Sequence, residues 1–183
     1  MKKLAFLVLI VLCFSVALVA SGDDANTFKA SLRGINETPG PVATQASGSF
    51  SATLSSDGAT LSYTVTYANL NAPVTQSHIH FGLSKEQGGI MIWLCQTAAA
   101  PAPVPATGPV VPTCPDTTSG TVHGTVSAAH VVGPNSQGIT PGADFAKVVQ
   151  AMREGAAYVN VHSTRSPIGE IRGPVRTGDG DDQ

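Results

Sequence analysis

Two stretches decide the fold: TQSHIHFG at residues 75–82 and YVNVHSTRSPIGEIRG at residues 158–173. Polar and apolar residues alternate along both, which is the period of a β-strand whose successive side chains point to opposite faces. In the first stretch His78 and His80 share one face, and apolar residues occupy the other. The alternation therefore predicts half-buried strands that gather polar side chains on one side of a sheet.

The second stretch is predicted to form an antiparallel hairpin, because a turn rich in Ser, Thr, Pro and Gly separates its two halves. Pairing Val161 with Ile171 on the core face is the preferred register, since a slip of one residue would bury the charged side chains. That register sets two polar pairs across the hairpin: His162 with Glu170, and Asn160 with Arg172. A carboxylate opposite His162 is expected to raise the pKa of the imidazole, or to orient it as a metal ligand.

The histidines on these strands, His78, His80 and His162, are candidate metal ligands. Two histidines separated by one residue on a strand lie about 6–7 Å apart on one face, and such pairs occur in copper and zinc sites. If His162 converges on the pair, three nitrogen ligands with an open position suit copper or zinc. If it does not, the pair belongs to a polar network of hydrogen bonds. The other members of that network are Asn160, Glu170 and Arg172.

The first 22 residues are predicted to be a signal peptide. Lys2 and Lys3 form a basic start, residues 4–20 are almost wholly apolar, and small residues at 20–22 offer a cleavage site. The apolar run is short for a membrane-spanning helix, which needs roughly twenty residues, and no later run could span a bilayer. The chain is therefore expected to be secreted, periplasmic or at the cell surface, with no membrane span after cleavage.

Charge and composition narrow the function classes. The chain has 10 Lys and Arg residues, two of them in the predicted signal peptide, against 12 Asp and Glu residues. Without a basic cluster, nucleic acid is not an expected partner. The sequence contains no Gly-x-Ser-x-Gly, phosphate-loop or His-Glu-x-x-His motif, so no catalytic residue is assigned and an enzyme is not predicted.

Two cysteines follow the signal segment, Cys95 and Cys114. An even pair in an oxidising compartment predicts a disulfide, while two metal-binding thiolates are the alternative, which lacks Cys-x-x-Cys spacing. Residues 97–116 are rich in Pro and Ala, so we expect a loop insertion whose base the disulfide closes. A proline-rich recognition segment is the second interpretation of these residues.

Eight segments are predicted as strands: residues 27–35, 47–55, 59–68, 75–81, 90–95, 120–127, 157–162 and 168–175. One helix is predicted, with Thr140 as its cap, Pro141 in its first turn and Gly155 after its end. The domain is expected to cover residues 26–175. Residues 176–183 are rich in Gly and Asp and are predicted to be a disordered tail.

Short motifs follow one another in a fixed order along the chain. They are LRGINETP at 32–39, Gly48, Asp57-Gly58, LSY at 61–63, HIH at 78–80, Gly88-Gly89, a helical segment at 145–155, YVNVH at 158–162 and GEIRG at 169–173. This order resembles the CHRD (chordin-type) domain family, from which the insertion at 97–116 departs. The resemblance implies a mainly β fold, an antiparallel immunoglobulin-like or Greek-key β-sandwich of about eight strands with one short α-helix.

Three functions are compatible with these motifs. The signal segment, the single β domain and the missing nucleophile motifs favour an extracytoplasmic binding or structural module, whose partner would be an extracellular or envelope protein or a glycan. The alternative is copper or zinc binding through the three histidines. A redox enzyme is the third hypothesis, because His-x-His near an arginine is also similar to copper-zinc superoxide dismutase. However, the chain lacks a recognisable bridging histidine and a zinc-binding loop.

Overall fold

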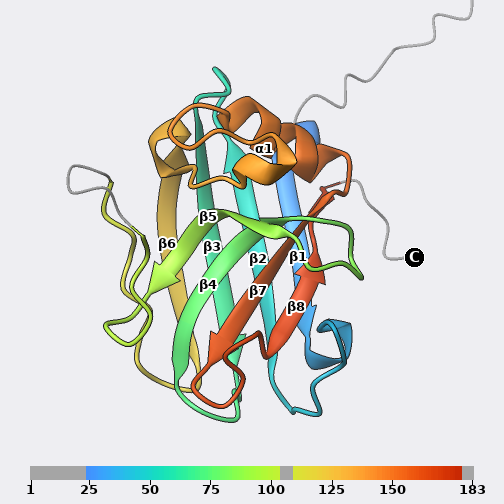
Figure 1. The fold of residues 1–183 in the computed structure, drawn as a ribbon, viewed down its shortest axis with the longest axis vertical. Helices are drawn as coiled ribbons and strands as arrows, with labels where there is room; N and C mark the ends of the chain where they lie inside the picture. Colours follow the sequence, from blue (N-terminus) through green and yellow to red (C-terminus); the bar gives the residue numbers. More distant parts are fainter. Residues whose placement is uncertain (1–23, 104–108, 179–183) are drawn as a thin grey trace, which may run out of the picture.

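The computed structural model describes residues 24–103 and 109–178 (Figure 1). The predicted signal peptide at 1–22 lies outside the described residues, as do the middle of the proline-rich insertion and residues 179–183. Arg176 and Thr177, which we expected in the tail, instead form a short strand that pairs with the first strand of the domain.

The described residues form one antiparallel sheet of nine strands. The strands are β1 (Thr27–Arg33), β2 (Ser47–Leu54), β3 (Thr60–Ala68), β4 (Val74–Phe81), β5 (Gly89–Gln96), β6 (Gly120–Ser127), β7 (Ala157–Ser163), β8 (Ile171–Pro174) and β9 (Arg176–Thr177). Short 3-10 helices lie at η1 (Asp24–Asn26), η2 (Gly34–Asn36), η3 (Ala128–His130) and η4 (Asn135–Gln137). The strand order is β5-β4-β7-β8-β1-β2-β3-β6, and β9 pairs with β1.

The sheet curls into a nearly closed barrel, in which β5 and β6 approach each other without a ladder between them (Figure 1). The prediction of a mainly β, antiparallel fold with one helix is confirmed. The immunoglobulin-like sandwich is not confirmed, because one continuous sheet runs through all the described strands. β7 lies between β4 and β8, so the chain returns to pair beside β4 after β5 and β6. Alternation assigns the two faces of each strand, but not how far the sheet curls.

The apolar faces of the strands line the barrel interior. Val161 pairs with Ile171 as predicted, and both are fully buried in the main core. Asn160 pairs with Arg172, also as predicted. Both faces of β7 are buried, so the polar face is more enclosed than the half-buried strand that the alternation predicted.

The helix is shorter than predicted. α1 (Phe145–Arg153) begins five residues after Thr140, and it lies across one end of the barrel (Figure 1). The Asp144 carboxylate accepts a hydrogen bond of 2.8 Å from the Thr140 backbone N–H, which holds the residues between them in a turn. The predicted apolar stripe is buried: Phe145, Val148, Val149 and Met152.

One tyrosine of β3 bridges the gap between β6 and β5. The Tyr63 hydroxyl donates to the Leu94 carbonyl of β5 at 2.5 Å, whereas the Tyr67 hydroxyl donates at 2.9 Å to the Pro115 carbonyl, in the segment that precedes β6. Tyr63 lies against Gly124 of β6, where an added Cβ would be 2.4 Å from its hydroxyl. Glycine on β6 therefore leaves the space through which a tyrosine of β3 reaches β5.

Gly124→Ala is expected to lower the free energy of unfolding by about 1–3 kcal/mol, because the new methyl group overlaps the Tyr63 ring. Gly40→Ala is the matched control, since no atom lies within 4 Å of its added Cβ. Urea denaturation measures both variants. Equal stability of the two would show that the tyrosine bridge does not need this glycine.

Candidate metal centre

The three candidate histidines meet on the outer, polar face of β4 and β7. In the β4–β7 ladder His78 pairs with Asn160 and His80 pairs with Tyr158, and opposed residues share a face. His162 lies two residues beyond Asn160, so it joins the same face. The exposed fractions of His78, His80 and His162 are 1%, 8% and 5%.

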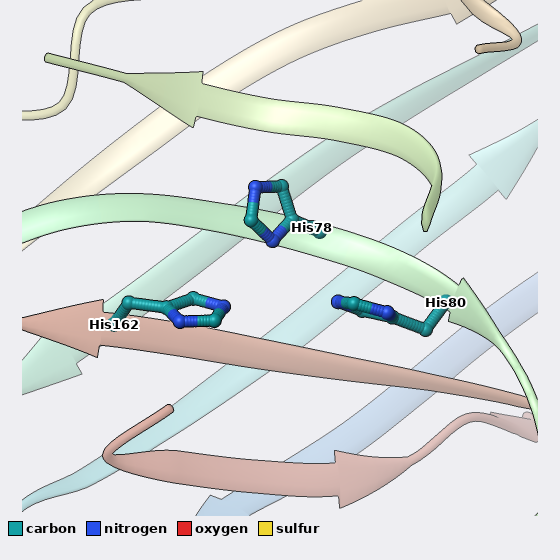
Figure 2. A group of neighbouring side chains, drawn as sticks. All are labelled: His78, His80 and His162. Atoms are coloured by element: carbon teal, nitrogen blue, oxygen red, sulfur yellow. The ribbon is translucent and has the colours of Figure 1, made fainter. Parts of the chain in front are cut away.

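The imidazoles converge on one point. One nitrogen from each ring lies within 4.8 Å of the others, and the rings of His80 and His162 point toward one another below His78 (Figure 2). Ligand nitrogens around a zinc ion lie about 3.3–3.5 Å apart, given bonds near 2 Å. Side-chain rotation that moves the nitrogens by roughly 1 Å would reach that spacing.

Two backbone carbonyls determine which nitrogens carry hydrogen. His162 Nδ1 lies 3.0 Å from the Pro167 carbonyl, and His80 Nδ1 lies 2.9 Å from the Gly88 carbonyl. Because a carbonyl only accepts, each Nδ1 donates, and the neutral ring then carries its lone pair on Nε2. His80 Nε2 lies 3.1 Å from Asn160 Oδ1, but a neutral ring cannot donate to both oxygens.

The remaining nitrogens of the cluster have no hydrogen-bond partner. These buried atoms are His162 Nε2 and both ring nitrogens of His78. A buried polar atom without a partner costs about 1–3 kcal/mol. Three buried ring nitrogens of the cluster, two on His78 and one on His162, are therefore left without a hydrogen-bond partner in the protein.

Burial keeps the three imidazoles neutral. It lowers the pKa of His80 and of His162 to about 4, and it holds the pKa of His78 well below its ordinary value. Repulsion from neighbouring histidines lowers the pKa of His78 and of His162 further. The expected rise in the pKa of His162 is therefore wrong. Neutral imidazole is the form that binds a metal ion.

Glu170 does not contact His162. Its carboxylate accepts hydrogen bonds from the Ser163 hydroxyl, the Thr44 hydroxyl at 2.8 Å and the Asn71 backbone N–H at 2.7 Å. These partners draw the carboxylate away from the imidazole. The Pro167 carbonyl, rather than Glu170, orients the ring of His162.

Arg172 makes no hydrogen bond to the imidazoles. Its guanidinium carbon is 3.4 Å from the centroid of the Tyr158 ring, and its nitrogens donate to the Leu83 and Glu86 carbonyls and the Thr38 hydroxyl. Of the three polar residues expected near the histidines, only Asn160 has a side chain within hydrogen-bond distance of one of them, with Oδ1 3.1 Å from His80 Nε2.

Two aromatic side chains that the sequence did not assign to the site enclose it. The ring of Trp93 meets that of His78 edge-on, with centroids 4.2 Å apart, and the ring of Tyr158 stacks on His80 at 4.7 Å. Trp93 was the available signal, because it is the single tryptophan of the chain and its strand pairs with β4.

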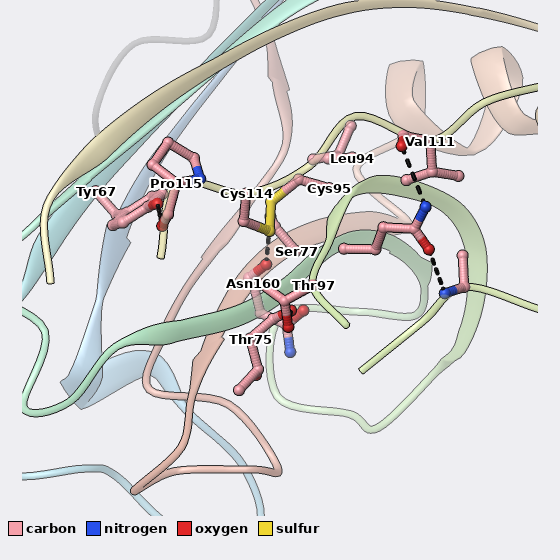
Figure 3. The surroundings of a disulfide bond; sticks show 12 residues. Tyr67, Thr75, Ser77, Leu94, Cys95, Thr97, Val111, Cys114, Pro115 and Asn160 are labelled. Atoms are coloured by element: carbon pink, nitrogen blue, oxygen red, sulfur yellow. Dashed lines mark hydrogen bonds between the residues drawn. A yellow bond between two sulfur atoms is a disulfide. The ribbon is translucent and has the colours of Figure 1, made fainter. Parts of the chain in front are cut away.

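The proline-rich insertion covers Trp93. Ala102 and Val111 pack with this tryptophan in a second, smaller apolar cluster. The predicted disulfide joins Cys95 to Cys114 with Cα atoms 5.1 Å apart, and it closes the base of the insertion (Figure 3).

The Gln96 side chain anchors both arms of the insertion. It accepts a hydrogen bond from the Ala102 backbone N–H at 2.7 Å and donates to the Val111 carbonyl at 3.2 Å. Thr97 adds a hydrogen bond of 2.9 Å to the Thr75 carbonyl of β4. The described arms of the insertion thus form part of the enclosure of the histidine cluster.

The metal-free protein is expected to lose at least about 3 kcal/mol of stability between pH 6.5 and pH 4. Over that range the unfolded chain takes up protons on all three histidines. The folded pKa values of His80 and His162 are about 4 and that of His78 is held well below its ordinary value, so acid favours unfolding. Glu37 opposes this partly, because burial raises its pKa to about 7 and the fold binds that proton first. Urea denaturation with a chelator present measures the profile. A flat profile would contradict the assigned protonation states.

The chain was compared with known proteins. A family model described as the CHRD domain matches residues 28–175. The chain belongs to the CHRD family. The matched part of this CHRD domain contains the three candidate histidines and both cysteines of the disulfide, and the predicted resemblance is confirmed. No curated protein and no solved structure matches the chain. Among the described residues, no helix has the length and apolar character needed to cross a membrane.

Proposed function

We propose that this CHRD domain binds one copper or zinc ion through His78, His80 and His162. The observation that carries the proposal is the convergence of three buried, neutral imidazoles, of which His78 and His162 have ring nitrogens without a hydrogen-bond partner. Imidazole nitrogen is a preferred ligand of both ions.

A purely structural polar network explains the same residues less well. Such a network stabilises a fold when its members satisfy one another, and a partly satisfied network is costly. His78 has no hydrogen bond on either nitrogen, although it is 1% exposed. An ion would use a lone pair of this ring, and the hydrogen bonds from His80 and His162 to backbone carbonyls would orient the other two ligands.

The compartment is part of the proposal. The segment at residues 1–22 has the pattern of an export signal, and a disulfide such as Cys95–Cys114 persists in oxidising surroundings. We therefore infer an exported module that holds metal outside the cytoplasm. A protein or glycan partner at the cell envelope is compatible with that role.

Metal uptake tests the proposal. Metal-free protein is dialysed against micromolar Zn(II) or Cu(II), and bound metal is measured by mass spectrometry of the digested protein. One ion per chain is expected. Cu(II) should also quench the fluorescence of Trp93, whose ring centroid lies 4.2 Å from that of His78. Absence of a bound ion with Zn(II), with Cu(II) and also with Cu(I) kept reduced by ascorbate would overturn the proposed function.

A further inference from the structure

We infer that the centre selects monovalent copper, Cu(I), over the divalent ions Zn(II) and Cu(II). The inference rests on the proposed function and specifies its ion. It follows from the absence of negative charge among the ligands and from the side chains that enclose the site.

The site supplies no negative charge. Among the described residues, the cluster able to hold an ion consists of three histidines, without a carboxylate or a thiolate. Glu170, the acidic residue expected nearby, is bound to Ser163, Thr44 and the Asn71 backbone. An ion bound to three neutral rings keeps its full charge.

A cation lies behind one of the ligands. Tyr158 stacks on His80 at 4.7 Å, and the Arg172 guanidinium carbon lies 3.4 Å from the centroid of the same tyrosine ring. Both groups cannot occupy one face of the ring without overlapping, so tyrosine separates them. The positive guanidinium disfavours a second positive charge at the histidines, and it does so more strongly for a divalent ion.

Burial adds to this preference. The free energy of moving an ion out of water grows with the square of its charge. For a divalent ion it is therefore roughly four times as large as for a monovalent one. Divalent ions in proteins commonly offset that cost with anionic ligands, which this centre lacks.

The side chains that enclose the cluster also favour an ion with a low coordination number. Trp93 meets His78 edge-on, while the insertion residues Ala102 and Val111 pack with Trp93. Zn(II) is almost always four-coordinate, and it would need water or another group at this enclosed position. Cu(I) is stable with three ligands alone.

Competition with chromophoric chelators tests the selectivity of the full chain. Cu(I) is kept reduced with ascorbate under nitrogen, and Zn(II) and Cu(II) are titrated separately. We expect the affinity for Cu(I) to exceed that for either divalent ion by at least about 100-fold. Divalent binding as tight as that of Cu(I) would overturn the inference, whereas failure of all three ions to bind would overturn the proposed function itself.

Asn160→Asp adds a test of the electrostatic cause. The side chain lies 3.1 Å from His80 Nε2, and the substitution introduces a negative charge with little change of shape. The preference for Cu(I) should shrink by about tenfold or more, because the carboxylate stabilises the divalent ions most.

Asn135→Asp, in the exposed 3-10 helix η4, makes the same chemical change outside the cluster and should leave the preference unchanged. An unchanged preference in a folded Asn160→Asp variant would overturn the electrostatic explanation. The wild-type affinities decide the selectivity even when that variant does not fold.

Discussion

His162→Gln is expected to weaken copper and zinc binding by roughly 100- to 1,000-fold, because it removes one of three ligands. His162 is the ligand that β7 contributes beside the two histidines of β4. Without its imidazole, only the two ligands on β4 remain at the site. Glutamine has a similar size and can still donate a hydrogen bond to the Pro167 carbonyl, as His162 Nδ1 does. Chelator competition measures the affinity, and urea denaturation of the metal-free protein checks the fold.

His123→Gln is the matched control for this prediction. His123 lies exposed on β6, where Nδ1 contacts the Thr64 hydroxyl at 2.9 Å, and it does not belong to the cluster. Its variant should bind metal as the wild type does. Equal affinities of the His162 and His123 variants would place the ion somewhere other than the proposed centre.

Replacing both cysteines by serine is expected to lower the free energy of unfolding by about 3 kcal/mol. The disulfide closes a loop between positions 19 residues apart, and a cross-link of that span restricts the unfolded chain by about this amount. The exposed fractions of Cys95 and Cys114 are 0% and 1%, so the serine hydroxyls would also be buried. Denaturation in urea, without added metal, measures the loss.

Reductant provides the control for the cysteine variant. Dithiothreitol should destabilise the wild type toward the value of the Cys95→Ser/Cys114→Ser variant, and it should leave that variant unchanged. If the wild type has the same stability with and without the reductant while its thiols become titratable, the disulfide does not stabilise the fold.

The local pattern of the sequence predicted the strands and part of the site. Alternation placed His78 and His80 on one face, and the apolar residues Val161 and Ile171 fixed the register of the β7–β8 pair. These predictions are confirmed because the two-residue period of a strand is a local property of the chain. The family resemblance was also readable from short motifs.

Contacts between distant segments could not be predicted in the same way. His162 reaches the other histidines through the β4–β7 ladder, which joins segments about eighty residues apart in the sequence. Glu170 binds Thr44 and the Asn71 backbone, and neither belongs to its hairpin. The pattern along one hairpin therefore named the polar residues but assigned Glu170 to the wrong partner.

The curvature of the sheet and the enclosure of the histidine cluster could not be predicted from the sequence. Whether strands form a sandwich or a barrel depends on how the sheet curls, and here Tyr63 bridges to β5 at the gap. The insertion at 97–116 was expected as a loop, but its packing of Ala102 and Val111 with Trp93 depends on the fold of β5 beneath it. Both features come from tertiary packing, which leaves no periodic signal.

X-ray absorption spectroscopy of the metal-loaded protein tests the central claim most directly. The proposed centre predicts a coordination shell with three imidazole nitrogens at about 2.0–2.1 Å from the ion. In the His162→Gln variant the number of imidazole nitrogens should fall to two. A shell dominated by oxygen, or one with fewer than three imidazoles in the wild type, would contradict a metal centre at His78, His80 and His162.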